Sequence, residues 1–583
     1  MYKVITGKLE ARTAIHLGSG QGNDLTDSLV RRNAQGQPFI PGTSIAGALR
    51  ALLTRLAPRI GFGLCKALDR SGGPCNCGAC HLFGDINPSE EPDSESRASR
   101  VLIFDTFPAQ GEPQIMIRDG VGIDRKSGAA ARAGAVKFDL ETVAAGSVFE
   151  LRMELVDSSP EDEKLLAAGL AEWQAGRFWL GGQVGRGLGA FTLSNLEYKT
   201  LGLDTPAQVL SFLKSDDPWQ IASVQPDWLQ DRVNSLDGNR CSFESQPNTV
   251  ARGWFLLTGI LQADGAVLAN DILTAGVSGF DHAPMLAHLC DWKTPVLTGA
   301  GLRGVLRSHA ERLVRTLVTL QASGKEDFLK RCPACDPNVR DRIPDRRLPL
   351  ESCDSLLRKA EKRNSHLFAN AGESEEAANY AESVCLACRL FGSPRQGSRL
   401  IVEDAPYHPA QNQTAPVYKM LDFLAIDRFT GGGADGFKFD ALALWQPAFC
   451  FRLYLENPEP WELGWLWLVL RDLMEGWLRV GFGGSKGFGQ VRLTDWRATF
   501  GYILSEDMLS LLELGLAEQK DGVYKTVQIS ESTKGWGTVL QKWIGAFHAK
   551  ISCFSRPAAT QMSEDTYFGL VDEVYPVQRG GAQ

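Results

Sequence analysis

Alternating and helix-spaced apolar residues divide the beginning of this chain into predictable elements. Near the N-terminus, apolar residues recur at intervals of two or four positions. This spacing predicts a strand through Ile5, Leu9, Ala11, Ile15 and Leu17. Further on, the spacing changes to that of a helix, at Ile45, Leu49, Leu52, Leu53 and Leu56. Thr43 or Ser44 is the candidate N-cap of this helix, and Pro58 is expected to help end it.

A second strand-and-helix pair follows in the same half of the chain. Apolar residues at every second position predict a strand through Phe149, Leu151, Met153 and Leu155. Ser159-Pro160 then begins a helix with acidic residues in its first turn, because proline and acidic residues are favoured at that position. The second half repeats this order, with a strand through Phe449, Phe451, Leu453 and Leu455 and a Trp-rich helix after Asn457-Pro458.

Short motifs recur in the same order with a period of about 300 residues. GIDR at 122–125 returns as AIDR at 425–428, and KFD at 137–139 returns at 438–440. Four further motifs recur in the second half of the chain. CGACHLFG corresponds to CLACRLFG, SRVLIFD to SRLIVED, GGQVGRGLG to GFGGSKGFG, and PGTSIAGALR to TGAGLRGVLR. Six matches in register indicate an internal duplication.

The duplication predicts a fold and its boundaries. Each copy reads strand, helix, strands, helix and strand, which is the order of a ferredoxin-like α+β sandwich. We expect a first domain over 1–200, a linker rich in Pro, Asp, Ser and Gln over 201–250, and a second domain over 251–500. Residues 501–583 match neither copy, and we expect a C-terminal extension of small helices and a partly disordered tail.

Composition limits the cellular location that we expect for the protein but does not decide its function. No run approaches the roughly 18 apolar residues that a membrane span needs, and the start lacks the apolar stretch of a secretion signal. A cytoplasmic protein that does not contact membranes is therefore expected. The net charge of −8 gives no bulk support for nucleic-acid binding, although an average hides local basic segments such as the one around Arg125 and Lys126.

The 13 cysteines are odd in number and most of them lie in close clusters, which suits metal binding better than disulfides. Two CxxC pairs predict one tetrahedral Zn²⁺ site at Cys332, Cys335, Cys385 and Cys388. A second site is predicted at Cys65, Cys75, Cys77 and Cys80. His81 and Cys353 are alternative ligands. Four protein ligands leave no open position, so both ions are expected to be structural.

Two kinds of segment are candidates for contacts with phosphate. The glycine-rich loops carry one basic residue each, Arg186 and Lys486, and glycines let backbone N–H groups approach an anion. The two loop-to-helix segments present helix N-termini, at Ser44 in the first copy, with Arg50, Arg303 and Arg307 on the helices. For both, ordinary turns and capped helices are the alternative explanation. Neither loop has the GxxxxGK[ST] pattern of a nucleotide-binding P-loop.

The chain resembles the RAMP superfamily of CRISPR-associated proteins in a combination of five motifs. These are IHLGSG, FIPGTSIAGALR, the LFG box, the IDR…FD segment and the terminal glycine-rich loop. The resemblance covers nearly all of 1–195 and 250–495. It is to the backbone subunits of type III effector complexes, and two such domains in one chain resemble the fused subunits of the type III-D branch. The predicted domain order is also compatible with the RNA-recognition fold.

The resemblance implies that each domain holds guide (CRISPR) RNA while complementary target RNA pairs alongside, together with other type III effector subunits. It implies a thumb-like hairpin around 122–139 and 425–440, which includes Arg125, Lys126 and Arg428. It also implies cleavage of the target at a loop aspartate, which matches Asp27 in the first copy, with Asp24 as the nearby alternative, and Asp281 in the second. His282 follows Asp281, and the second copy has no clear match to His16.

The chemistry expected at these aspartates is attack by the RNA 2′-OH on the adjacent phosphate, with the carboxylate as general base or as a ligand of Mg²⁺ or Mn²⁺. Two other hypotheses remain. A non-catalytic scaffold would hold guide RNA while other subunits cut. An enzyme that trims guide precursors would be expected to use a histidine acid–base site, and no histidine recurs at a motif.

Overall fold

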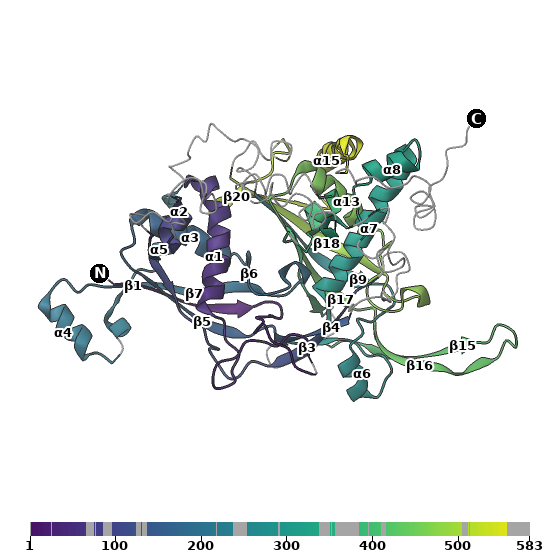
Figure 1. The fold of residues 1–583 in the computed structure, drawn as a ribbon, viewed down its shortest axis with the longest axis horizontal. Coiled ribbons are helices and arrows are strands. Elements are labelled where there is room, and N and C mark those ends of the chain that lie inside the picture. The colour runs from purple at the N-terminus through teal and green to yellow at the C-terminus, as the bar shows by residue number, and fades with distance from the viewer. Residues whose placement is uncertain are drawn as a thin grey trace.

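The computed structural model describes residues 2–24, 26–63, 65, 75, 77–85, 96–123, 130, 137–216, 218–236, 253–289, 292–336, 350, 352–355, 384–394, 396–409, 415–503, 511 and 513–556. The statements that follow concern these residues. They form two similar α+β domains that lie side by side, each with its helices on one face of an antiparallel sheet (Figure 1).

The first domain is built on a sheet in the order β2-β5-β1-β7-β6. In chain order its main elements are β1 (Tyr2–Ala11), α1 (Gly42–Leu56), α2 (Gly78–Phe83), β2 (Val101–Ile103), β3 (Ile115–Val121), β4 (Lys137–Val143), β5 (Val148–Leu155), α3 (Pro160–Gln174), β6 (Phe178–Trp179) and β7 (Ala190–Leu201). β3 and β4 form a separate hairpin. The strand order with α1 and α3 as crossovers is ferredoxin-like, as predicted.

The second domain repeats this arrangement with strands added at both edges. Its main elements are β9 (Trp254–Ala263), α7 (Gly299–Gln321), α12 (Leu386–Phe391), β13 (Leu400–Val402), β15 (Tyr418–Ile426), β16 (Gly433–Trp445), β17 (Ala448–Glu456), α13 (Pro460–Met474) and β18 (Val491–Tyr502). β17, β9 and β18 pair in that order, and β13 pairs with β17. The β15–β16 hairpin extends away from the body (Figure 1).

A shared irregularity shows how closely the two copies correspond. The pairing of β1 with β7 and of β9 with β18 shifts register at one point in each domain. There the backbones of Asn195 and Asp495 have φ of 50° and 49°, a left-handed conformation that these two residue types tolerate. Gly7 and Gly259 lie opposite, where a Cβ would come within 2.9 Å of Leu193 and 2.8 Å of Leu493. The duplication therefore extends to single residues.

The start of α1 differs from the local cap that the sequence predicts. The N-cap is Pro41, whose side chain cannot accept a hydrogen bond, in place of Thr43 or Ser44. The carboxylate of Asp105, from the segment after β2, instead accepts a hydrogen bond from the Gly42 amide at 2.8 Å. Asp404 caps α7 in the same way through Gly299, also at 2.8 Å. A tertiary contact thus replaces the expected local one.

The two domains share buried surface. Ile401 and Tyr454 of the second domain belong to the hydrophobic core of the first, and the Trp179 and Tyr454 rings lie 4.7 Å apart. Arg118 Nη2 lies 2.6 Å from Asp404 Oδ2, and both side chains are buried. The interface between the two domains is therefore continuous with the hydrophobic core of the first domain.

The segments outside the two predicted domains add to them. The expected linker, 201–250, is described as far as Leu236; its helix α5 (Trp228–Asn234) packs on α3, with the Trp228 and Tyr198 rings 4.4 Å apart. Beyond residue 500, β20 (Tyr524–Ser530) pairs with β18, and α15 (Trp536–Cys553) packs on α13. The tail for which disorder was predicted lies beyond Arg556, outside the described residues. Within the described part of the chain, no helix has the length and apolarity to cross a membrane.

Candidate functional site

Asp27 lies where the loop after β1 meets the hairpin of β3 and β4. The loop runs beside β4 in parallel, with Ser28 bridged to Leu140 and its carbonyl accepting from the Glu141 amide at 2.9 Å. Asp27 Oδ2 accepts a hydrogen bond from the Asp139 amide at 2.9 Å. Asp139 is the aspartate of the first KFD motif. The loop aspartate is therefore held against the base of the hairpin.

Asp281 occupies the equivalent place in the second domain. Its Oδ2 accepts from the amide of Asp440 at 3.0 Å, and its own amide donates to Asp440 Oδ1 at 2.8 Å. His282 is bridged in parallel to Ala441, as Ser28 is to Leu140. The structure thus brings each predicted loop aspartate to the aspartate of a KFD motif.

A histidine stands beside each aspartate, from a different position in each domain. His16 is buried, and its Nδ1 donates to the Glu141 carbonyl at 2.7 Å, since a carbonyl oxygen only accepts. In the neutral ring, Nε2 then accepts from the Ser28 hydroxyl at 3.0 Å. In the second domain, His282 follows the loop aspartate itself, and its ring lies 4.3 Å from that of Phe482. The second domain has no counterpart of His16 at that position, and its histidine, His282, instead takes the place of Ser28.

A second carboxyl group of the first hairpin is electrostatically unusual. Asp119 faces Asp139 across the β3–β4 ladder. Burial, together with hydrogen bonding to the Asp139 carboxylate, raises the pKa of Asp119 to about 6. The ionised form of Asp119 is disfavoured, because a second negative charge nearby is unfavourable.

The basic residues of the glycine-rich loops lie next to these hairpins. Arg186 is exposed, with its guanidinium 5.7 Å from the centre of the Phe138 ring. Lys486 lies 4.6 Å from the Phe439 ring centre in the same arrangement. Phe138 and Phe439 are the phenylalanines of the two KFD motifs. The structure therefore gathers three motifs of each copy, the loop aspartate, KFD and the glycine-rich loop, at one place.

The helix residues that were predicted to contact phosphate contact other groups of the protein instead. Arg50 Nη2 lies 3.4 Å from Cys80 Sγ, and Arg307 Nη2 lies 3.5 Å from Cys388 Sγ. Arg307 also pairs with Glu311, and Arg303 donates to the Phe391 carbonyl. The helix N-termini are already occupied by Asp105 and Asp404. The structure thus gives these residues internal partners that the sequence does not reveal, and anion binding at the helix starts stays a prediction.

The other predicted contacts are placed as follows. Ser44 is half-buried in the first turn of α1, and Arg428 is exposed in the turn of the β15–β16 hairpin. Arg125 and Lys126 lie outside the described residues.

The first cysteine group has the predicted members. The Sγ atoms of Cys65, Cys75, Cys77 and Cys80 all lie within 4.8 Å of one another, and Cys65 and Cys80 are 3.6 Å apart. Tetrahedral Zn²⁺ with Zn–S bonds of about 2.3 Å needs sulfurs about 3.8 Å apart. Burial raises the pKa of Cys80 to about 12. His81 is not a member of this group of ligand atoms, and its Nδ1 pairs with Asp162 at 2.7 Å.

The second group differs from the prediction by one member. Cys335, Cys353, Cys385 and Cys388 gather within 4.8 Å of one another, and Cys332 is not among them. Cys332 is the residue after α8 (Lys325–Arg331), and its sulfur donates to the Ala334 carbonyl at 3.4 Å. Cys353 arrives from the insertion between the knuckles, and its sulfur accepts from the Cys385 amide at 3.2 Å. Both groups offer four thiols, a donor set suited to a closed metal site.

Comparison with known proteins agrees with this arrangement. The sequence profile of the RAMP superfamily matches residues 8–192 and 291–492, one region in each domain. The chain therefore belongs to the RAMP superfamily and contains two RAMP domains.

Two relatives bear the name CRISPR system Cms endoribonuclease Csm3. The chain is 28% identical over 122 residues to the Csm3 of Methanothermobacter thermautotrophicus, which is 18% of this chain and 45% of the relative. It is 28% identical over 173 residues to that of Methanocaldococcus jannaschii, which is 28% of this chain and 66% of the relative. The matches thus span between about half and two thirds of the relatives.

Sequence reasoning missed Asp139 and Asp440 as members of the two sites. Their recurrence in KFD was visible, but only the pairing of the loop with the hairpin shows which residue each aspartate contacts. A search for acidic residues that recur in register with the loop aspartates would have found them.

Proposed function

We propose that this protein is a guide-RNA-binding backbone subunit of a type III CRISPR effector complex that cleaves complementary target RNA at two sites. The observation that supports this most directly is the repeated contact of Asp27 with Asp139 and of Asp281 with Asp440. A loop aspartate fixed in the same way in both domains is expected if both positions act on the same kind of substrate. Membership of the RAMP superfamily and similarity to proteins named as endoribonucleases support the same proposal.

The arrangement of charges suits an RNA strand passing between loop and hairpin. Arg186 and Lys486 are exposed and lie over the phenylalanine ring of each KFD motif, next to the aspartate that contacts the loop, where they neutralise phosphate. The partners are then guide RNA, complementary target RNA and other type III subunits. Sequence specificity comes from base pairing, as in other guided systems.

The reaction uses the 2′-OH of the target RNA as its nucleophile. Asp27 or Asp281 accepts the hydroxyl proton while the oxygen attacks the neighbouring phosphorus, and the P–O5′ bond breaks. The leaving 5′-oxygen takes a proton from water, and the products are a 2′,3′-cyclic phosphate and a 5′-hydroxyl. In the first site, the His16 ring is held by two hydrogen bonds near the loop, so it is fixed in orientation.

The carboxylate oxygens also fit a hard divalent cation. Asp27 in the first domain and Asp281 in the second would hold Mg²⁺ or Mn²⁺, and the cation would supply stabilisation of the developing negative charge. Among the described residues, only the two cysteine groups bring three or more ligand atoms together. A cation at these aspartates would therefore keep several of its waters.

Each cysteine group is proposed to hold a structural Zn²⁺. The four sulfurs complete a tetrahedral shell and leave no position for substrate. Arg50 and Arg307 contact one sulfur of each group, and so offset the negative charge of the thiolates.

The experiment uses the assembled complex with its guide and an end-labelled matching RNA. Asp27→Ala and Asp281→Ala should each abolish one scission, with a loss of about a hundredfold or more in its rate, and the double variant should abolish both. Asp24→Ala, at an exposed loop residue, is the matched control and should leave both scissions. If both scissions persist in the double variant, the subunit is a scaffold for guide RNA and other subunits cut.

A further inference from the structure

Arg118 lies on β3, and its side chain crosses from the first domain to the second. Its Nη2 atom lies 2.6 Å from Asp404 Oδ2, and only 7% and 5% of the two side chains are exposed. The other oxygen of Asp404, Oδ1, accepts a hydrogen bond from the Gly299 amide at the start of α7. One buried carboxylate of the second domain therefore contacts both a helix start and a strand of the first domain.

The place of Arg118 in the β3–β4 hairpin connects this ion pair to the first aspartate site. Arg118 faces Leu140 across the ladder, and Leu140 is bridged to Ser28 in the loop after β1. The residue before Leu140, Asp139, donates its amide to Asp27 Oδ2 at 2.9 Å. A displacement of β3 would therefore also displace the strand that holds the loop aspartate.

β3 and β4 form a two-stranded sheet that is separate from the main sheet of the first domain. A two-stranded hairpin is marginally stable by itself, so the contacts of its side chains contribute to holding it in place. The second domain approaches it at a further point, since the Asp271 carboxylate adds to the effects of burial and of Asp139 that raise the pKa of Asp119. Figure 1 shows β3 and β4 at the junction of the two domains.

The second hairpin, β15–β16, is held in a different way. When the aspartates of the two KFD motifs are aligned, the ladders make Leu421 the counterpart of Arg118. Leu421 packs on a cluster of buried apolar residues of its own domain. The cluster consists of Ala266, Leu268, Ala441, Ala443 and Phe488. Because leucine carries no charge, the second hairpin has no ion pair at this position.

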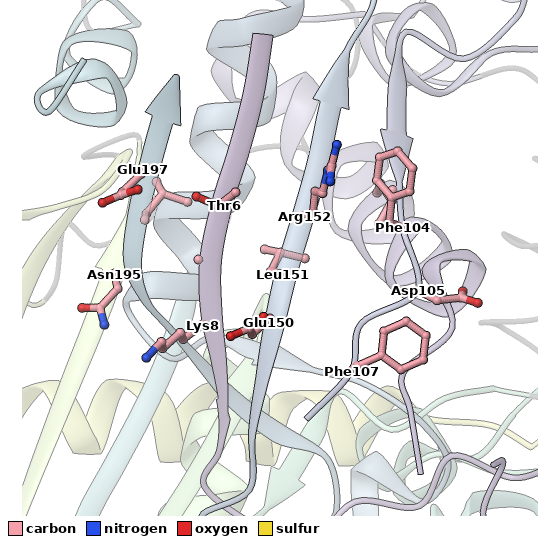
Figure 2. Close-up of a pocket in the computed structure, with 13 residues that line it drawn as sticks. Thr6, Lys8, Phe104, Asp105, Phe107, Glu150, Leu151, Arg152, Asn195 and Glu197 are labelled. Atoms are coloured by element: carbon pink, nitrogen blue, oxygen red, sulfur yellow. The ribbon is translucent and has the colours of Figure 1, made fainter. Parts of the chain in front are cut away.

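The ion pair is also separate from the capping of the helices. Asp105, the counterpart of Asp404, caps α1 through the Gly42 amide at 2.8 Å. Asp105 is exposed at the border of a hollow of about 1200 Å³ (Figure 2), and among the described residues no lysine or arginine forms an ion pair with it. α1 is thus capped without a buried cation, so the capping of α7 does not by itself require Arg118.

We propose that Arg118 is a positioning residue for the first aspartate site, which is complete only when the second domain holds the β3–β4 hairpin through Asp404. The inference rests on the proposed function, in which Asp27 acts on target RNA. It adds an asymmetry to that function, because the first scission depends on the contact between the domains and the second does not. Arg118 acts through β3 and β4 and does not touch the substrate.

Two variants separate positioning from stability. Arg118→Leu alone leaves the Asp404 carboxylate buried without its cation, so it also destabilises the fold. Arg118→Leu combined with Asp404→Asn removes both charges, and the asparagine keeps an oxygen that caps α7. Chemical denaturation of this double variant should lie close to that of the wild type, since no buried charge is left unpaired. Arg55→Leu breaks another ion pair between the domains, with Glu456 at 2.8 Å, and is the control.

Hydrogen exchange of the full chain, measured by mass spectrometry, tests the anchoring of the hairpin. In the double variant, the amides of β4 should exchange about tenfold faster than in the wild type, because the hairpin opens more often. The amides of β16 should exchange as in the wild type, and Arg55→Leu should change neither strand. Unchanged exchange of β4 in the double variant would overturn the proposal.

The assembled complex, with its guide and an end-labelled target, tests the consequence for cleavage. The double variant should slow the scission that depends on Asp27 about tenfold, since small misplacements of a catalytic group are costly. It should leave the scission that depends on Asp281 unchanged, and Arg55→Leu should leave both.

Two results of the cleavage assay would overturn the proposal. If the double variant recovers the first scission together with its stability, the ion pair only stabilises the fold. If both scissions slow equally, the effect is not confined to the β3–β4 hairpin. A wild-type complex that cuts at neither position would instead contradict the proposed function, and the exchange of β4 would still decide whether Arg118 anchors the hairpin.

Discussion

Asp281 and Asp440 hold each other through two hydrogen bonds, one from each backbone amide to the other's carboxylate, at 2.8 and 3.0 Å. One aspartate belongs to a loop and the other to the strand β16, more than 150 residues apart in sequence. The pair therefore ties the loop to the hairpin, and the orientation of the Asp281 carboxylate depends on the hairpin staying in place.

The first prediction separates the positioning role of Asp440 from a role as a metal ligand. Asp440→Ala removes the acceptor for the Asp281 amide, and the scission at that site should slow about tenfold to a hundredfold, because small misplacements are costly. Asp440→Asn keeps an oxygen at the accepting position and should retain most of the rate. The scission that depends on Asp27 is the internal control. An Asn variant as slow as the Ala variant would contradict a purely positioning role.

The second prediction concerns the membership of the second cysteine group. Wild-type protein should contain two zinc ions per chain, one for each group of four cysteines. Cys353→Ser should reduce the count to one, since a thiolate ligand is lost. Cys332→Ser is the matched variant in the neighbouring segment and should keep both ions. Elemental analysis of the purified proteins measures this, and the opposite pattern would restore the ligand set that the sequence alone suggested.

The third prediction follows from the raised pKa of Asp119, which burial and the Asp139 carboxylate shift from 3.8 to about 6. Between these values the native state binds more protons than the unfolded state, so the free energy of unfolding should fall as the pH rises through this interval. Asp119→Asn removes the titrating group and should flatten that dependence. Denaturant unfolding at a series of pH values measures it, with Asp24→Asn as an exposed control. An equal slope in wild type and Asp119→Asn would contradict the raised pKa of Asp119.

The fourth prediction concerns the ion pair between the domains. Arg118→Ala leaves the Asp404 carboxylate buried without its cation, and should lower the free energy of unfolding by about 3 kcal/mol. Lys542→Ala breaks an exposed pair with Glu513 and should change it by less than about 1 kcal/mol. Chemical denaturation compares the two. Equal small effects would mean that the Arg118 pair is not shielded from water as the structure indicates.

Local pattern was sufficient for elements whose causes lie in neighbouring residues. The alternation at 149–155 predicted β5, and Ser159-Pro160 predicted the start of α3, where Ser159 and Asp162 form a capping box. The start of α1 was beyond such reasoning, because its cap is a carboxylate from Asp105. The contacts of Arg50 and Arg307 with cysteine sulfurs could not be predicted either. An arginine in a helix has the same sequence pattern whether its side chain faces solvent or a sulfur.

By itself, the sequence determined that this protein is a duplication, that each half is an α+β domain, and that cysteines gather in two groups. These features are written in periodicity and spacing, which depend on residues near one another along the chain. Only the tertiary structure decided that Cys353 takes the place of Cys332 in the second cysteine group, and that Asp139 and Asp440 contact the two loop aspartates. Those outcomes depend on which distant segments the folded backbone brings within hydrogen-bond distance, and no local pattern records that choice.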